Sequence, residues 1–255
     1  MRPTELQSAI LHPTQKTLSV VPSFRRYEVH TKSTDFRKAT HIVEEAELPA
    51  AKAGSVVVQN HYVGINATDI NTTNGTYMAQ VPTPFGCGLE AVGVVVAVGD
   101  GVENVEVGAP VAYRKLGAFT EYFVLDATEV IPIPEVSKEV LPLLVSGVSA
   151  SQALSIAGEM KSGETVLVTA AAGGTGQFVV QLAKLAGNHV IGTTSSDEKA
   201  EVLKALGCDR VIDYNKESIA DVLKSEYPKG VDLVFETIGG EMLKTAVDNI
   251  AVHGR

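Results

Sequence analysis

The stretch AAAGGTGQFVVQLAK, from Ala170 to Lys184, joins a run of small residues to an apolar segment with helical spacing. Ala171, Gly173 and Gly176 occupy the three positions of the pattern G-x-G-x-x-G. A strand-like segment, ETVLVTA, precedes the loop, so the loop connects a strand to a helix, which is the context that dinucleotide binding requires. We expect Gly173 to admit a pyrophosphate close to the backbone and Gly176 to let the helix pack closely on the strand. Ala171 lacks the freedom for positive φ at the tight first turn, but it is small.

The start of the helix predicted after this loop supplies unpaired N–H groups and the positive end of the helix dipole. We therefore predict an anion site formed by five residues: Ala171, Gly173, Gly174, Thr175 and Gly176. The alternative interpretation is a glycine-rich turn that binds no ligand.

Short apolar strands and amphipathic helices alternate through the rest of the C-terminal half. Strands are predicted at 164–170, 188–194, 209–214 and 231–237, and helices at 174–187, 196–207, 216–227 and 239–251. This alternation predicts an α/β fold with a doubly wound parallel sheet. Such sheets usually have six strands, so four strands indicate either a small variant or a sheet truncated at the C-terminus.

The N-terminal half has a different rhythm, with closely spaced β-branched strands and Gly and Pro turns, as in SVVVQNHYVGIN and AVGVVVAVG. This spacing predicts a compact, partly closed β domain. We expect four parts in all: an N-terminal extension (1–24), a β domain (25–136), a connecting helical segment (137–160) and a nucleotide-binding domain (161–255).

The end of the second predicted strand of the C-terminal half indicates which dinucleotide binds. NAD binding requires an acidic residue there, whereas Ser195 and Ser196 are uncharged and Lys199 follows one helical turn later. Hydroxyl groups and a cation suit a 2′-phosphate, so we favour NADP(H). Asp197 and Glu198 oppose this interpretation, unless they serve the helix start through a capping box between Ser195 and Glu198. Tyr214, after the third strand, is a candidate to flank the adenine.

Composition excludes several classes of function. The formal net charge of the 255 residues is -9, and no cluster of Lys and Arg is present to neutralise a nucleic acid. Two cysteines are too few for a disulfide framework or a structural zinc site. The longest apolar run is too short to cross a bilayer. We therefore expect a soluble intracellular protein with neither a nucleic-acid partner nor a membrane partner.

Several of these motifs resemble a known family. LVTAAAGGTGQF, HVIGTTSSDEK, LKALGCDRVIDY and EYPKGVD, together with VGINATDIN and LLVSG, are similar to the zinc-independent quinone oxidoreductase branch of the medium-chain dehydrogenases/reductases. The resemblance extends from about residue 23 onward. It implies a GroES-like β domain followed by a Rossmann domain. It also implies NADPH-dependent reduction of the carbon–carbon double bond of 15-oxo-prostaglandins and related enones, a 15-oxo-prostaglandin 13-reductase activity.

The resemblance also bears on the reacting groups. At the positions where metal-using relatives hold a catalytic zinc, this chain has Asn66, Leu89 and Ser146, which are poor or impossible zinc ligands. We expect no zinc. Without a metal, the enolate oxygen needs hydrogen-bond donors, and the matching cleft positions nominate Tyr77 and Asn66, although each of them could instead have only a structural role. Thr237, after the fourth strand, is a candidate contact to the cofactor.

Two alternatives to enone reduction stay open: an NADPH:quinone oxidoreductase with the same fold, and a non-catalytic NADPH-binding protein. The expected partner is a small enone or quinone, and the full-length form could be a homodimer. The resemblance implies a peroxisomal location in lipid metabolism, with the cytoplasm as the alternative.

Overall fold

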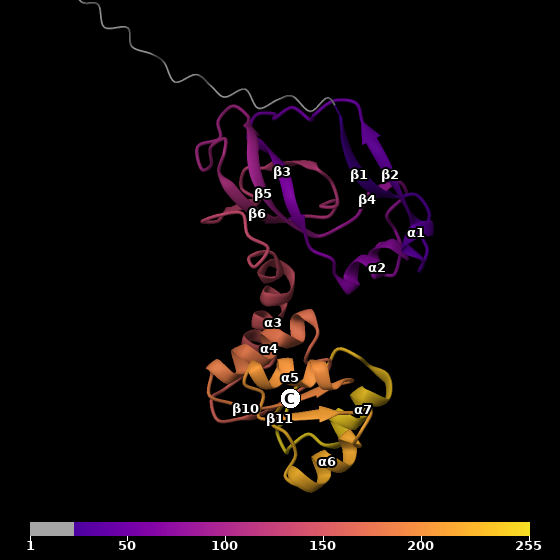
Figure 1. Cartoon of the computed structure of the whole chain (residues 1–255), viewed down its shortest axis with the longest axis vertical. Helices are drawn as coiled ribbons and strands as arrows, with labels where there is room; N and C mark the ends of the chain where they lie inside the picture. The colour runs from indigo at the N-terminus through magenta and orange to yellow at the C-terminus, as the bar shows by residue number, and fades with distance from the viewer. Residues whose placement is uncertain (1–22) are drawn as a thin grey trace, which may run out of the picture.

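Parallel strands and helices alternate through the C-terminal half, and this confirms the predicted doubly wound sheet. The computed structural model describes residues 23–255 (Figure 1), so the expected extension lies outside the described residues except for its last two. The four strands are β9 (Thr165–Val168), β10 (His189–Thr194), β11 (Arg210–Asp213) and β12 (Leu233–Phe235), paired in the order β11-β10-β9-β12. The helices that follow them are α4 (Gly174–Leu185), α5 (Asp197–Ala205), α6 (Ile219–Glu226) and α7 (Gly240–Asp248).

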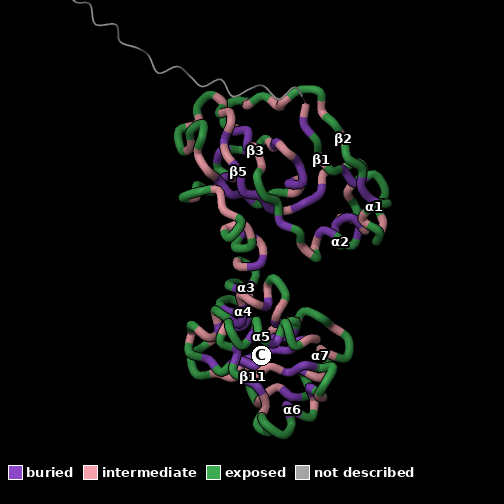
Figure 2. The backbone as a smooth tube through the Cα atoms, in the orientation of Figure 1, coloured by how far each residue is buried: buried purple, intermediate pink, exposed green. Residues whose placement is uncertain are grey.

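Apolar residues cover both faces of this sheet, because successive side chains of a strand point to opposite sides. Val166 and Val168 pack in one core with α4, whereas Leu167 packs in a second core with α6 and α7. Strand β9 is therefore buried on both faces, which is why it reads as a continuous apolar run. Figure 2 shows buried backbone in the interior of this half and exposed segments around it.

The last residues of the chain lie beside β12. Val231 and Ile250 form a parallel bridge. Further along, the Arg255 N–H donates to the Asp232 carbonyl (3.0 Å) and the Arg255 carbonyl accepts from Val234 N–H (2.8 Å). The final residue thus continues the parallel hydrogen-bonding pattern on the edge of β12.

The N-terminal half forms two antiparallel sheets, as predicted for a partly closed β domain. One has the strand order β7-β3-β5-β6-β8 and the other the order β2-β1-β4. Their strands are β1 (Phe24–Val29), β2 (Thr40–Glu45), β3 (Ser55–Val63), β4 (Phe85–Gly86), β5 (Glu90–Val98), β6 (Pro110–Arg114), β7 (Tyr122–Asp126) and β8 (Val130–Pro132). A bridge between Arg26 and Thr120 links the two sheets.

Two short helices in this half, α1 (Phe36–Ala39) and α2 (Ala67–Thr73), were not expected from the sequence. The α2 sequence, ATDINTT, consists mostly of residues with low helix propensity and has no apolar period. Its start is stabilised locally, because the Asn66 N–H donates to Asp69 Oδ2 at 2.8 Å.

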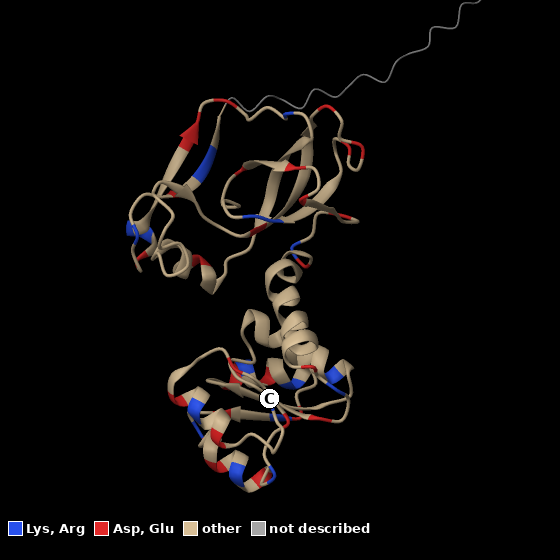
Figure 3. Cartoon of the chain, turned by 180° about the vertical axis from the view of Figure 1, so that it is seen from behind, with Lys and Arg blue, Asp and Glu red and all other residues tan. Residues whose placement is uncertain are grey.

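A helical segment connects the two halves, built from the π-helical turn η1 (Leu143–Gly147), the helix α3 (Val148–Gln152) and a second π-helical turn, η2 (Ala153–Ala157). Leu144 packs with Val92 and Ala112 of the β sheet, whereas Ala150 and Leu154 belong to the core of the parallel sheet. This connector carries no Lys, Arg, Asp or Glu, as its uniform colour in Figure 3 shows.

No helix within residues 23–255 is both long enough and apolar enough to span a membrane.

Candidate cofactor site and active site

The glycine loop follows β9 directly and opens α4. The residue that adopts positive φ is Ala170 (φ 45°), so our assignment of the tight first turn to Ala171 is wrong by one position. Ala171 is fully buried, and a side chain on Gly192 of the neighbouring strand would come within 3.0 Å of its Cβ. The methyl group of Ala171 therefore packs against Gly192 of β10.

The two glycines of the pattern differ in their surroundings. A Cβ on Gly176 would lie 2.4 Å from the Ala170 carbonyl oxygen and 2.7 Å from that of Ala171, so helix α4 could not pack this closely on the loop with any other residue there. Gly173, by contrast, is exposed and has a single neighbour, Ala170 O, at 3.1 Å from such a Cβ. A ligand can therefore approach the backbone at Gly173.

The start of α4 offers hydrogen-bond donors. Gly173 is the N-cap and has no side chain to accept from the first turn. Within residues 23–255, the N–H groups of Gly174, Thr175 and Gly176 donate to no acceptor. Unpaired donors at a helix start, next to an open backbone, fit a bound pyrophosphate.

The loop after β10 and the first turn of α5 hold the three predicted 2′-phosphate residues, Ser195, Ser196 and Lys199. Ser196 is the N-cap of α5, and its Oγ accepts from Lys199 N–H at 3.4 Å. The expected capping box between Ser195 and Glu198 is therefore wrong. Strand β10 runs to Thr194 and the helix begins at Asp197, which moves the cap one residue along the chain. The Ser195 carbonyl accepts instead from Asn215 Nδ2 at 2.7 Å.

Tyr214 directly follows β11 and brings the neighbouring loop to the same edge of the sheet. Its N–H donates to the Thr194 carbonyl at 3.0 Å, and its side chain is 44% exposed. Two buried hydroxyl groups beneath these loops, those of Thr193 and Thr194, have no hydrogen-bond partner among the described residues. Polar groups without partners thus gather at the carboxyl edge of β10.

Thr237 lies at the same edge of the sheet, after β12 on the other side of β9. It is exposed, and its N–H donates to Thr169 Oγ1 at 3.2 Å. The neighbouring Glu236 carboxylate accepts from Ile238 N–H (2.7 Å) and from Gly239 N–H (3.0 Å), which closes this loop.

In the N-terminal half, Asn66 lies next to two buried carboxylates. Its side-chain Nδ2 donates to Glu90 Oε1 at 2.8 Å, and Glu90 Oε2 accepts from Val145 N–H at 2.9 Å. Burial raises the pKa of both Glu90 and Asp69. Sequence analysis did not identify Asp69, although the spacing Asn66-x-x-Asp69 is a recognisable helix-start signal.

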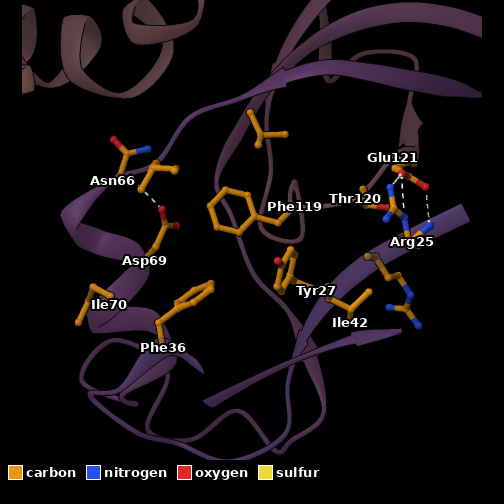
Figure 4. A pocket seen from close by; sticks show the side chains of 13 residues that line it. Arg25, Tyr27, Phe36, Ile42, Asn66, Asp69, Ile70, Phe119, Thr120 and Glu121 are labelled. Atoms are coloured by element: carbon orange, nitrogen blue, oxygen red, sulfur yellow. Dashed lines mark hydrogen bonds and ion pairs between the residues drawn. The ribbon is translucent and has the colours of Figure 1, made fainter. Parts of the chain in front are cut away.

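A hollow of about 560 Å³ in this half of the chain has Asn66 at its edge. Figure 4 shows Asn66 and Asp69 on one side of the hollow and the Arg25–Glu121 ion pair on the other. Most of the remaining lining is apolar: Tyr27, Phe36, Ile42, Val63, Ile65, Ile70 and Phe119. Tyr77 does not line this hollow; it is 59% exposed, and its N–H donates to the Asn71 carbonyl (3.1 Å). The structure therefore does not bring the two nominated catalytic side chains into one pocket.

The zinc positions implied by the resemblance do not form a donor set. The Asn66 amide is bonded to Glu90, Leu89 has no ligating atom in its side chain, and Ser146 is buried close to Gly174. No cluster of three or more His, Cys, Asp or Glu that could hold a metal occurs in the described part of the chain. An amide, an aliphatic side chain and a hydroxyl do not suit zinc.

Two protein-family models match the chain. The model described as alcohol dehydrogenase GroES-like domain matches residues 52–135, and the model described as zinc-binding dehydrogenase matches residues 174–255. The second description names a metal for which the residues at the three positions above provide no ligands.

Curated proteins and solved structures are similar over most of the chain. Prostaglandin reductase-3 of Mus musculus is 48% identical over 93% of this chain, which spans 63% of that protein. A probable quinone oxidoreductase of Leishmania amazonensis is also 48% identical, with 93% of this chain and 70% of that protein covered. The crystal structure of Escherichia coli quinone oxidoreductase complexed with NADPH matches with a TM-score of 0.79 and 30% identity, over 90% of this chain and 71% of that one.

Proposed function

Because this chain belongs to the quinone oxidoreductase branch of the medium-chain dehydrogenases/reductases, we propose that the whole protein is an NADPH-dependent reductase of α,β-unsaturated ketones. We propose 15-oxo-prostaglandins as the substrate class, since the relative from Mus musculus is named prostaglandin reductase-3. In this proposal, residues 161–255 bind the cofactor, and residues 25–136 contribute the part of the active site that contacts the substrate.

The observation that carries the proposal is the glycine loop. Gly173 leaves the backbone open, and the N–H groups of Gly174, Thr175 and Gly176 have no acceptor within residues 23–255. These groups would hold the pyrophosphate of the dinucleotide. Ser195, Ser196 and Lys199 would hold the 2′-phosphate, with Tyr214 beside the adenine and Thr237 toward the rest of the cofactor.

When bound, the nicotinamide supplies a hydride to the β-carbon of the enone, and negative charge develops on the carbonyl oxygen. The role of the protein is then to stabilise that oxygen with fixed donors. Asn66 suits this role because Glu90 holds one N–H of its amide, which leaves the second N–H for the substrate oxygen. The apolar hollow beside Asn66 suits an apolar substrate chain. Tyr77 lies outside this hollow, so its proposed role as a second donor rests on the resemblance alone.

The test is NADPH oxidation by the purified protein with a 15-oxo-prostaglandin and, separately, with an ortho-quinone. We expect turnover of the enone. Faster turnover of the quinone would support the second candidate, NADPH:quinone oxidoreductase, which the name of the Leishmania amazonensis relative favours. Tight NADPH binding without turnover of either compound would identify a non-catalytic binding protein.

A Lys199→Ala variant tests the cofactor assignment separately. One phosphate–lysine contact contributes about 1–3 kcal/mol, so NADPH affinity should fall by about 5- to 150-fold. NADH affinity should change little, because NADH lacks the 2′-phosphate. Equal losses for the two nucleotides in a calorimetric titration would contradict the assignment.

Two further expectations stay predictions. Sedimentation of the purified protein would test for a homodimer, and microscopy of a tagged full-length protein would test for a peroxisomal location.

A further inference from the structure

A second lysine, Lys216, lies next to the loop that follows β10. It belongs to the turn after β11, and its Nζ forms ion pairs with Asp197 and, at 3.7 Å, with Asp213 Oδ2. The residue before it, Asn215, donates to the Ser195 carbonyl at 2.7 Å. The turn after β11 is therefore attached to the proposed 2′-phosphate loop by one hydrogen bond and one ion pair.

Asp197 presents an electrostatic problem for NADPH. It directly follows Ser196, and 80% of its side chain is exposed. A carboxylate at this edge of the sheet repels a 2′-phosphate, and it can accept a hydrogen bond from the free 2′-hydroxyl of NADH. Left unpaired, Asp197 would favour the cofactor without the phosphate.

We propose that Lys216 determines cofactor specificity: its ammonium group pairs with Asp197 and cancels the charge that would repel the 2′-phosphate. This inference rests on the proposed NADPH binding. The mutual effect of the pair agrees with it, because Lys216 lowers the pKa of Asp197 and Asp197 raises that of Lys216.

The fold does not need this side chain. The turn is closed by backbone groups, since the N–H groups of Lys216 and Glu217 both donate to the Asp213 carbonyl, at 2.9 and 3.1 Å. The Asn215 N–H donates to Asp213 Oδ1 at 3.1 Å. The Lys216 side chain is 57% exposed, and an ion pair between exposed side chains contributes little to stability. Replacing Lys216 should therefore leave the loop in place and change only its charge.

Lys199 and Lys216 differ in their charged neighbours. Lys199 forms no ion pair within residues 23–255, whereas Lys216 is shared between two carboxylates. Lys199 would act on the phosphate directly, and Lys216 would act mainly through Asp197. The two roles predict different responses when Asp197 is also replaced.

The experiment measures the affinities of NADPH, NADH, adenosine 2′,5′-bisphosphate and 5′-AMP by calorimetry, which needs no turnover. Lys216→Met should weaken NADPH and the bisphosphate by about tenfold, equivalent to about 1.4 kcal/mol, and should leave NADH and AMP unchanged or bound more tightly. Lys216→Met combined with Asp197→Asn should recover most of that loss. Asp197→Asn added to Lys199→Ala should recover much less.

Lys244→Met is the matched control, because Lys244 also lies in an exposed ion pair, with Asp248 at 2.5 Å in helix α7, and is not among the charges that shift the pKa of Asp197. It should change each affinity by less than about twofold. If Lys216→Met weakens the phosphorylated and unphosphorylated ligands equally, or if Asp197→Asn restores nothing, the inference is wrong while the proposed function stands. If the unaltered protein binds NADPH no better than NADH, the proposed cofactor and this inference both fail.

Discussion

Two pairs of carboxyl groups, one pair in each half of the chain, have opposite surroundings. In the β-rich half, Glu90 and Asp69 are buried, and burial raises the pKa of each carboxyl group. In the half that contains the parallel sheet, Glu217 and Glu226 are paired with the Arg210 guanidinium near the surface, and this cation lowers the pKa of both.

This contrast distinguishes charged groups that stabilise the fold from charged groups that act on a bound ligand. A buried carboxylate that accepts two hydrogen bonds holds its neighbours in place, so its loss should reduce stability. An exposed charge such as Asp197 contributes little to folding but acts on any ligand that comes close. Substitution of a buried carboxylate should therefore lower the free energy of unfolding, whereas substitution of an exposed one should change ligand affinity.

The largest effect should come from Glu90→Leu. This change leaves the Asn66 amide and the Val145 N–H without their acceptor, at a cost of about 1–3 kcal/mol for each buried donor. The free energy of unfolding from urea titration should fall accordingly. Asp197→Asn, the matched acidic substitution in the other half, should leave it almost unchanged, because the Asp197 side chain is exposed. Similar losses of unfolding free energy in the two variants would contradict the proposed difference between buried and exposed carboxylates.

Gly176→Ala should have the next largest effect, in the half that contains the parallel sheet. The added Cβ meets backbone carbonyl oxygens at 2.4 and 2.7 Å, and backbone cannot move aside cheaply. We expect a loss of about 1–3 kcal/mol in unfolding free energy, together with weaker NADPH binding. Gly147→Ala is the control, because its nearest neighbour would be a leucine methyl at 3.5 Å; a loss as large as that of Gly176→Ala would contradict the packing argument.

The smallest effect, of about 1 kcal/mol or less, is a difference in the response to acid. Because the pKa of Glu90 is raised in the folded state, the stabilisation that protonation of Glu90 provides is fully present below the unfolded value of 4.5 and is lost as the pH rises through its folded pKa. The lowered pKa values of Glu217 and Glu226 give contributions that are present above 4.5 and are lost as the pH falls.

Urea titrations across this pH range can separate the two contributions. The stability of the unaltered protein relative to Glu90→Gln should decrease as the pH rises, whereas its stability relative to Arg210→Met should increase. If both stability differences change in the same direction with pH, then burial and ion pairing do not shift the pKa values of these groups as we infer.

Much of the C-terminal half could be predicted from the sequence, because its signals are local. The alternation of apolar strands and amphipathic helices predicted the parallel sheet, and the elements lie within a few residues of their expected positions. The glycine pattern identified the loop that opens α4. Helix α2 was missed because its residues have no apolar period and only its capping contact marks it.

The sequence by itself determined where the glycine loop lies and which residues stand at the strand ends, since these properties depend on residues close together in the chain. Only the tertiary structure decided that Lys216 neutralises Asp197, that Glu90 connects Asn66 to Val145, and that Ala170 rather than Ala171 adopts positive φ. The physical reason is that the first two contacts join segments brought together by strand pairing and packing. The third depends on how tightly α4 packs against β9, a distance that no local pattern specifies.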